Sequence, residues 1–304
     1  MKKKETAVFD VLQARYPGLV EKVRGLIEGS ERRFTGRSGK QDSYLWEHTT
    51  HVASLAFDLA NAEKMDPVVP AVAALFHDAG KFMDGTYHAG RRTEEDDAAR
   101  LAGPVLRGAG MKPRDIRRVA FALRALYDAR AGRDAVAGIV HDADFLSKFG
   151  ALGVAQFFIK STLRGQNLRH ALMRSLSKEL TYAAGLPGNM RTKAGKRLAE
   201  RKSAETLRFF RSLMRELRET RIADVVVKRV LVEAVSRPGR PIMVRLAIPR
   251  VCDSCGGRWT IAHLTERGTK CEKLEVEIIC ARCGECSSFS FCLPEVPPRV
   301  RRIA

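Results

Sequence analysis

The chain has 304 residues, a formal net charge of +19, and 45% hydrophobic and 29% charged residues. This balance excludes a disordered chain and a membrane protein, because the longest apolar runs, such as residues 68–76, are far too short to span a bilayer. The lysine-rich N-terminus continues into a mixed amphipathic stretch without the apolar core of a secretory signal, so we expect a cytoplasmic protein with no membrane association.

Helical periodicity dominates the first two thirds of the chain. A polar stretch over residues 29–41 predicts a loop, and Thr93 is a predicted N-cap before an acidic first turn. Gly103-Pro104 is expected to end or kink the helix that Thr93 begins. The spacing of apolar residues predicts helices over residues 7–27 (divided at Pro17-Gly18), 48–62, 68–76, 93–102, 113–126, 136–149, 152–163 and 193–221.

After residue 223 the composition shifts to β-branched residues. Residues 225–235 and 242–248, separated by a Pro-Gly turn, predict a β-hairpin. All seven cysteines follow it, between Cys252 and Cys292. We therefore predict two domains, a helical one over residues 1–222 and a small β-rich module over residues 223–304.

The excess of positive charge is concentrated in residues 161–250, which contain 21 Lys or Arg residues against 7 Asp or Glu. Such an excess favours an anionic partner: a nucleotide, a nucleic acid or a phospholipid headgroup. A solvated helix face explains the same composition equally well, so both interpretations stay open.

Two histidines and two aspartates indicate a metal site in the helical domain. His77 and Asp78 are adjacent at the end of a predicted helix, where both side chains can turn inward. His48 begins an upstream helix, and Asp144 lies within a downstream one. Mixed nitrogen and oxygen ligands suit one divalent cation (Mn, Mg, Co, Ni or Fe) rather than a closed thiolate zinc site. Such an ion polarises a phosphoryl group and lowers the pKa of bound water, as phosphoester hydrolysis requires.

These positions resemble the motif of the HD superfamily of metal-dependent phosphohydrolases. The segment AALFHDAGK at residues 73–81 is similar to the family's AALLHDxGK, and DADFL at residues 142–146 is similar to the DADxLD of small bacterial HD nucleotide hydrolases. Residues 190–201 resemble the late helix of that group. The resemblance covers residues 44–217 and implies a mainly α fold, an HD-type α-helical bundle, to which a small C-terminal β/zinc-ribbon module is added.

The chain departs from this family pattern at two positions. Ser147 stands where the family usually has a second Asp after DADxL, and Tyr127 stands where many members carry a further His. Both departures favour one bound metal ion over two. The Ala-Asp-x-Leu register favours Asp144 over Asp142 as the fourth ligand, which leaves Asp142 as a general base or as a support behind the ligands.

Besides Asp78 and Asp142, two residues near the motif are candidates for catalytic roles. Lys81, one turn from His77-Asp78, is either a point charge that contacts phosphate or a solvated lysine. His88 lies in a Gly-flanked loop beside Arg91 and is a candidate general acid for the leaving group.

The cysteines include two CxxC pairs, each followed by glycine: Cys252 with Cys255, and Cys280 with Cys283. Two such knuckles place four thiolates around one zinc ion, and the arrangement resembles a zinc ribbon. A closed site of this kind is structural, and the ion contributes folding free energy to a module with little core. Cys286 is an alternative to Cys283 as a ligand.

The sequence therefore predicts an enzyme that hydrolyses a phosphomonoester, a phosphodiester or a nucleotide pyrophosphate bond through metal-activated water. Its expected partner is a nucleotide or another phosphorylated small molecule. The alternative is a nucleic-acid-binding or nuclease-type protein, in which the ribbon and the basic helix dock RNA or DNA and the HD site is auxiliary or vestigial. The oligomeric state stays open.

Overall fold

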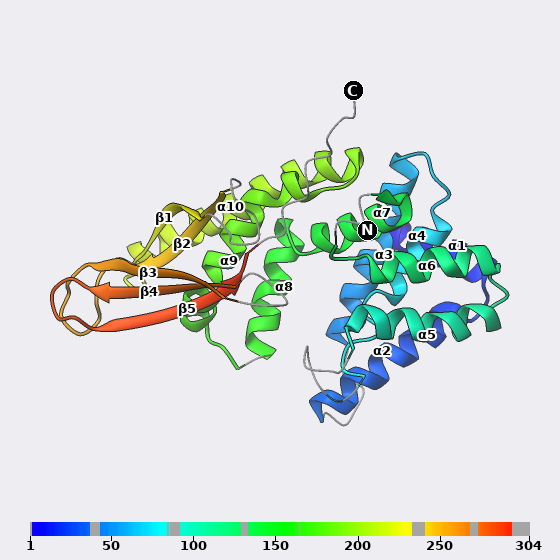
Figure 1. The fold of residues 1–304 in the computed structure, drawn as a ribbon, viewed down its shortest axis with the longest axis horizontal. Coiled ribbons are helices and arrows are strands. Elements are labelled where there is room, and N and C mark those ends of the chain that lie inside the picture. Colours follow the sequence, from blue (N-terminus) through cyan, green and yellow to red (C-terminus); the bar gives the residue numbers. More distant parts are fainter. Residues whose placement is uncertain are drawn as a thin grey trace. The chain divides into compact units, whose positions relative to one another are not determined.

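The computed structural model describes residues 2–36, 43–83, 85, 92–128, 133–163, 165–232, 241–267 and 273–293. They form ten α-helices and five β-strands (Figure 1), which confirms a mainly α fold with a small C-terminal β region. Two compact units result, the first from the described residues up to Ser147 together with Gly188–Ala199, and the second from those of Lys148–Pro187 and Glu200–Val296. The domains predicted at 1–222 and 223–304 divide the chain differently, and that division stays a prediction.

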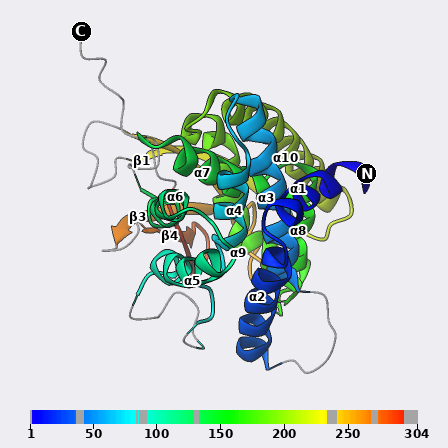
Figure 2. The same cartoon turned by 90° about the vertical axis from the view of Figure 1, so that its right-hand side faces the viewer.

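The first unit is a helical bundle around α4. Every residue of α4 from Val69 to Phe76 is buried, and α4 packs against α3, α6 and α7 (Figure 2). The apolar run in the sequence is thus the central helix of this unit. Its helices are α1 (Lys2–Arg15), α2 (Leu19–Thr35), α3 (Tyr44–Ala62), α4 (Val68–Phe76), α5 (Glu94–Gly108), α6 (Pro113–Arg124) and α7 (Ala135–Ser147).

Local interactions explain where two of these helices begin and end. Thr93 caps α5 as predicted, because its hydroxyl accepts a hydrogen bond from the Asp96 backbone N–H at 3.2 Å. Gly103-Pro104 was expected to end or kink this helix, and an end there is wrong, since α5 continues to Gly108 and keeps Leu106 in the core. The loop predicted over residues 29–41 is wrong for residues 29–35, which belong to α2. Glu28 stabilises this helix by forming ion pairs with arginines one turn away on either side.

Gly80, two residues after Asp78, lies in close contact with the backbone of the first turn of α5. A Cβ at this position would overlap the Glu94 carbonyl oxygen and lie 2.7 Å from the Ala98 backbone nitrogen. We therefore expect Gly80→Ala to lower the free energy of unfolding by about 1–3 kcal/mol, because backbone rather than a flexible side chain must move. Urea unfolding followed by circular dichroism measures this change.

Gly25→Ala in the middle of α2 is the matched control, because a Cβ there meets no atom within 4 Å. Within a helix this change is expected to stabilise the protein by up to about 1 kcal/mol. Equal effects of the two substitutions would contradict the close approach of α5 to Gly80.

The second unit combines helices with two antiparallel sheets. Its helices are α8 (Gly150–Leu163), most of α9 (Leu168–Asn189) and the greater part of α10 (Lys193–Glu219). The predicted hairpin is confirmed as β1 (Val225–Val232) and β2 (Ile242–Pro249), and the second sheet has the order β3 (Trp259–Arg267), β4 (Lys273–Cys280) and β5 (Cys286–Cys292). No helix in the described ranges is long and apolar enough to cross a bilayer.

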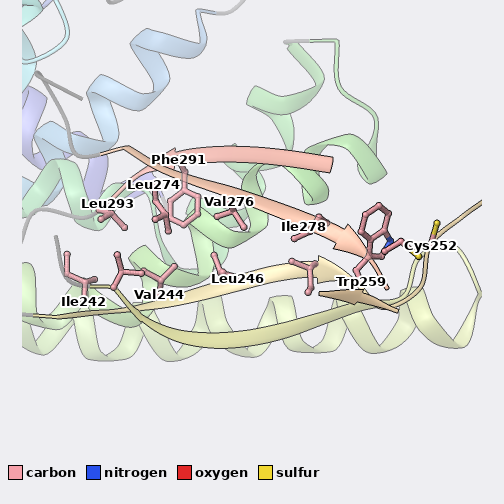
Figure 3. Packing of buried hydrophobic residues seen from close by; sticks show 13 residues of the cluster. Ile242, Val244, Leu246, Cys252, Trp259, Leu274, Val276, Ile278, Phe291 and Leu293 are labelled. Carbon is pink, nitrogen blue, oxygen red and sulfur yellow. The ribbon is translucent and has the colours of Figure 1, made fainter. Parts of the chain in front are cut away.

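The two sheets face each other across one apolar core. In β2, every second residue from Ile242 to Ile248 points into it, which is the period expected of a strand with one buried face. Figure 3 shows this row opposite side chains of the second sheet, with Trp259 beside Cys252 at one end; the labelled partners are Leu274, Val276, Ile278, Phe291 and Leu293. Cys252 and Cys280 are therefore part of a packed core.

Candidate metal sites

Packing of α3, α4 and α7 brings the four predicted ligands of the helical domain together. His48 comes from α3, His77 and Asp78 directly follow α4, and Asp144 lies in α7. Nε2 atoms of His48 and His77 are 3.3 Å apart. The distance from His77 Nε2 to Asp78 Oδ1 is 3.4 Å. All four side chains are buried.

Asp144 completes the set by approaching both imidazoles. Its Oδ1 lies 3.5 Å from His48 Nε2 and 3.8 Å from His77 Nε2. His48 Nε2 is also 3.6 Å from Asp78 Oδ2. Two ligand atoms bound to one ion at about 2.1 Å lie about 3.0–3.4 Å apart, so small movements would let these residues share one cation. The residues therefore fit a divalent ion with mixed nitrogen and oxygen ligands.

The two imidazoles have the ring orientation and the neutral form that metal binding requires. His77 Nδ1–H donates to the Ala74 carbonyl oxygen at 2.7 Å, which leaves the Nε2 lone pair directed at the cluster. Burial lowers the pKa of His48 below its ordinary value, which favours a neutral imidazole.

Lys81 belongs to this cluster rather than to the solvated surface. Its Nζ donates to Asp78 Oδ2 at 2.6 Å, and its side chain is mostly buried. Burial opposes ionisation of Asp78, but His77 and Lys81 outweigh it and hold the pKa of that carboxyl well below its usual range. Asp78 is therefore an anionic carboxylate with one oxygen positioned by an ammonium group.

The two departures from the family pattern both contact Asp144. Tyr127 Oη donates to Asp144 Oδ2 at 3.0 Å, and Ser147 Oγ donates to the Asp144 carbonyl oxygen at 2.7 Å. Burial and the charge of Asp144 raise the pKa of Tyr127 well above its ordinary value, so this hydroxyl remains a donor. Tyr127 thus positions the Asp144 carboxylate, whereas Ser147 bonds only the backbone of the same helix. Sequence reasoning treated them only as missing ligands.

Tyr127→Phe removes the hydroxyl that positions Asp144 and keeps the aromatic ring. We expect divalent-metal affinity of the helical domain to fall about 10–100-fold, the usual effect of losing a hydrogen bond behind a ligand. Titration calorimetry with Mn²⁺ on the chelator-treated protein measures it. An affinity equal to that of the wild type would show that this hydrogen bond does not position the ligand.

Asp142 makes its hydrogen bonds to the start of α10 rather than to the four predicted ligands, and its catalytic role stays a prediction. Its Oδ1 accepts from the Arg191 backbone N–H, and its Oδ2 accepts from the backbone and hydroxyl of Thr192, each at 2.7–2.8 Å. Asp142 is fully buried and fixes the start of α10. The other catalytic candidate, His88, lies outside the described residues.

The second site is formed by the predicted cysteine set. One ligand atom from each of Cys252, Cys255, Cys280 and Cys283 lies within 4.8 Å of the others. Sγ atoms are 3.8 Å apart for Cys252 and Cys283, and 3.5 Å apart for Cys255 and Cys280. The alternative ligand Cys286 is exposed, and its Sγ contacts the Gly284 carbonyl oxygen. Four converging thiols fit a tetrahedral zinc site.

Each CxxC pair is followed by a glycine that closes a tight backbone turn. Gly256 and Gly284 adopt positive φ values of 71° and 76°, and each donates its N–H to the carbonyl of the first cysteine of its pair. N–H groups of Cys283 and Arg282 lower the pKa of Cys280 to about 7, which favours the thiolate that zinc binds. Sequence spacing predicted the knuckles but not these donors.

Comparisons with known proteins agree with the helical site. Residues 45–147 match the family model described as HD domain. None of the curated proteins compared with the chain matches it. Among solved structures, the chain is similar to YpgQ of Bacillus subtilis in complex with ADP, at 23% identity and a TM-score of 0.45 over 63% of this chain and 97% of that one.

Two further solved structures are similar to this chain. One is a predicted HD superfamily hydrolase from an uncultured Thermotogales bacterium, with 20% identity and a TM-score of 0.47 over 68% of this chain and 98% of that one. The other is an HD-superfamily hydrolase from Bacillus thuringiensis, with 21% identity and a TM-score of 0.45 over 65% of this chain and 97% of that one. The stretch that matches the HD domain model, residues 45–147, includes His48, His77, Asp78 and Asp144.

Proposed function

We propose that the protein is a metal-dependent phosphohydrolase whose HD domain holds one divalent cation through His48, His77, Asp78 and Asp144. The observation that carries this proposal is the convergence of four buried ligand side chains, with both Nε2 atoms within 3.8 Å of Asp144 Oδ1. These four polar residues come from three distant segments of the chain, and a shared cation would compensate the cost of burying them together.

A divalent ion bound there would polarise a phosphoryl oxygen and lower the pKa of bound water. Neighbouring residues of the chain orient the proposed ligands. Ala74 orients His77, while Tyr127 positions the Asp144 carboxylate. Lys81 places positive charge beside Asp78 at the edge of the cluster, where it is also available to neutralise a phosphate oxygen.

A single ion fits the site better than two. Tyr127, at the position of the further histidine in the family pattern, is a protonated hydrogen-bond donor rather than a ligand. Ser147 is engaged with the backbone of α7. We propose a mononuclear site that acts on a nucleotide or another phosphoester in the cytoplasm, with His88 still a predicted general acid.

We propose further that Cys252, Cys255, Cys280 and Cys283 hold a structural zinc ion. The four thiols leave no open position for substrate, which distinguishes this site from the one in the HD domain. Gly257 supports this assignment, because a Cβ there would lie 2.7 Å from Cys280 Sγ and 3.2 Å from Cys255 Sγ.

Hydrolysis of a substrate panel tests the proposed activity. The purified protein is stripped of divalent ions in the HD domain, supplied with Mn, Mg, Co, Ni or Fe, and given nucleoside mono-, di- and triphosphates and a general phosphodiester. We expect hydrolysis of at least one class, dependent on the added ion, and the products identify which bond is cleaved. A protein that binds the added ion in its HD domain and hydrolyses none of these substrates would contradict the proposal.

A further inference from the structure

Three arginines from three elements of the second unit gather on one face of the hairpin. Arg229 of β1 is the Cα partner of Arg245 of β2, so their side chains leave the same face of the two-stranded sheet. Val225 and Ala247, on that same face, pack in one cluster with Phe210 of α10. Arg211 follows Phe210 directly on α10 and is exposed, close enough for its charge to lower the pKa of Arg245.

The position of Arg245 is fixed by the neighbouring helix α9. Its backbone N–H donates to Thr181 Oγ1 at 2.9 Å, and its carbonyl accepts from the same hydroxyl at 3.4 Å. Ser177, one turn earlier, makes the same pair of contacts with Ala247. The outer edge of β2 is therefore bound to a helix, which makes this arginine-bearing face a rigid part of the fold.

No carboxylate neutralises these arginines within the described ranges of the chain. Arg211, Arg229 and Arg245 form no ion pair there. Neighbouring arginines behave differently, because Arg218 and Arg250 both pair with Asp224, at 3.0 and 2.8 Å. The Nε atom of Arg245 is buried without a hydrogen-bond partner. Burial, followed by the charges of Arg229 and Arg211, lowers the pKa of Arg245.

This like-charge arrangement extends along α10. Arg208 and Arg215 lie three residues before and four residues after Arg211, and therefore on the same side of the helix. Like charges at these spacings, and directly opposite each other across two strands, destabilise a fold that lacks counterions. In the described ranges none of these five arginines forms an ion pair, and an external polyanion explains their arrangement better than stability of the protein alone.

We propose that Arg211, Arg229 and Arg245 form the centre of a nucleic-acid-binding surface, with the flanking arginines of α10 contacting the phosphodiester backbone. This surface belongs to the second unit and is independent of the phosphohydrolase activity proposed for the HD domain.

The residue types favour nucleic acid over other anionic partners. The guanidinium group pairs with phosphate through two parallel hydrogen bonds, which makes arginine the usual residue for phosphodiester recognition. Exposed apolar side chains lie on the same face of the hairpin: Val227, Leu231 and Met243, of which Leu231 is 62% exposed. They offer contacts for sugars or bases beside the phosphate-binding arginines. Phosphate ligands alone would not require these apolar contacts.

Fluorescence anisotropy with labelled 20-nucleotide RNA, single-stranded DNA and duplex DNA tests this surface. The variant Arg211→Glu/Arg229→Glu reverses two exposed charges and leaves the partly buried Arg245 in place. We expect the wild type to bind at least one of these nucleic acids. The double variant should bind it roughly tenfold or more weakly, with a shallower salt dependence by about 0.7–0.9 per lost phosphate contact.

The matched control is Arg114→Glu/Arg117→Glu, which makes the same change in net charge on two exposed arginines of α6. It should retain wild-type affinity, and both variants should keep the wild-type zinc content and circular dichroism spectrum. Equal losses in the two variants would overturn the proposal, because only net charge would then matter. It would also be overturned by a wild type that binds phosphatidylserine vesicles but none of the nucleic acids.

Discussion

Asp78→Ala is expected to remove the divalent ion from the HD domain and to lower hydrolysis of the phosphoester by more than about 100-fold. That figure is the upper end of the effect of losing a group behind a ligand, and Asp78 is itself a proposed ligand. The substitution also leaves the buried Lys81 ammonium without its 2.6 Å partner, which further disturbs the site. Metal content by elemental analysis and the rate on the best substrate of the panel measure both effects.

Asp58→Ala provides the control for this substitution. Asp58 is an exposed carboxylate on α3, the helix that also carries His48, and it makes no hydrogen bond or ion pair in the described part of the chain. We expect wild-type metal content and activity. If Asp78→Ala kept its metal and its activity, the ion would have to be bound elsewhere, and the proposed mechanism would be wrong.

Cys280→Ser is expected to eliminate zinc from the cysteine site and to destabilise the two-sheet core. Cys280 is buried within this core and is the cross-strand partner of Trp259. Structural zinc sites contribute on the order of 10–16 kcal/mol of binding free energy in small peptides, so losing one ligand removes a large part of the stability of the module. Zinc content and the fluorescence of Trp259 during thermal unfolding measure the loss.

Cys286→Ser is the matched control, because it makes the same atomic change at an exposed cysteine outside the four-thiol set. It should keep one zinc ion per chain and the wild-type unfolding temperature. Zinc loss in Cys286→Ser together with retention in Cys280→Ser would reverse the ligand assignment and support the alternative considered from the sequence.

The sequence predicted best those elements whose pattern is local. The helix expected over residues 68–76 has those same bounds as α4, because a long apolar run in the centre of a bundle has few alternatives. The hairpin of β1 and β2 was equally clear from its β-branched residues. In contrast, α9 was not predicted at all. It carries Gly185, Pro187 and Gly188 near its end, and packing within the second unit stabilises it despite these residues.

The site was predictable in its residues but not in its contacts. The motif identified His48, His77, Asp78 and Asp144, yet only the packing of three helices from distant parts of the chain gives their separations. Asp142 shows the limit of motif reasoning. It lies two positions from Asp144, and a helical rotation of about 100° per residue turns the two side chains to different sides of α7. One approaches the imidazoles, and the other caps α10.

Anomalous diffraction from crystals grown with Mn²⁺ tests the central claim most directly. A single manganese peak is predicted in the HD domain, within coordination distance of His48, His77, Asp78 and Asp144, with room left for solvent. A peak bound by other residues, while these four side chains keep only their direct contacts with one another, would contradict the account.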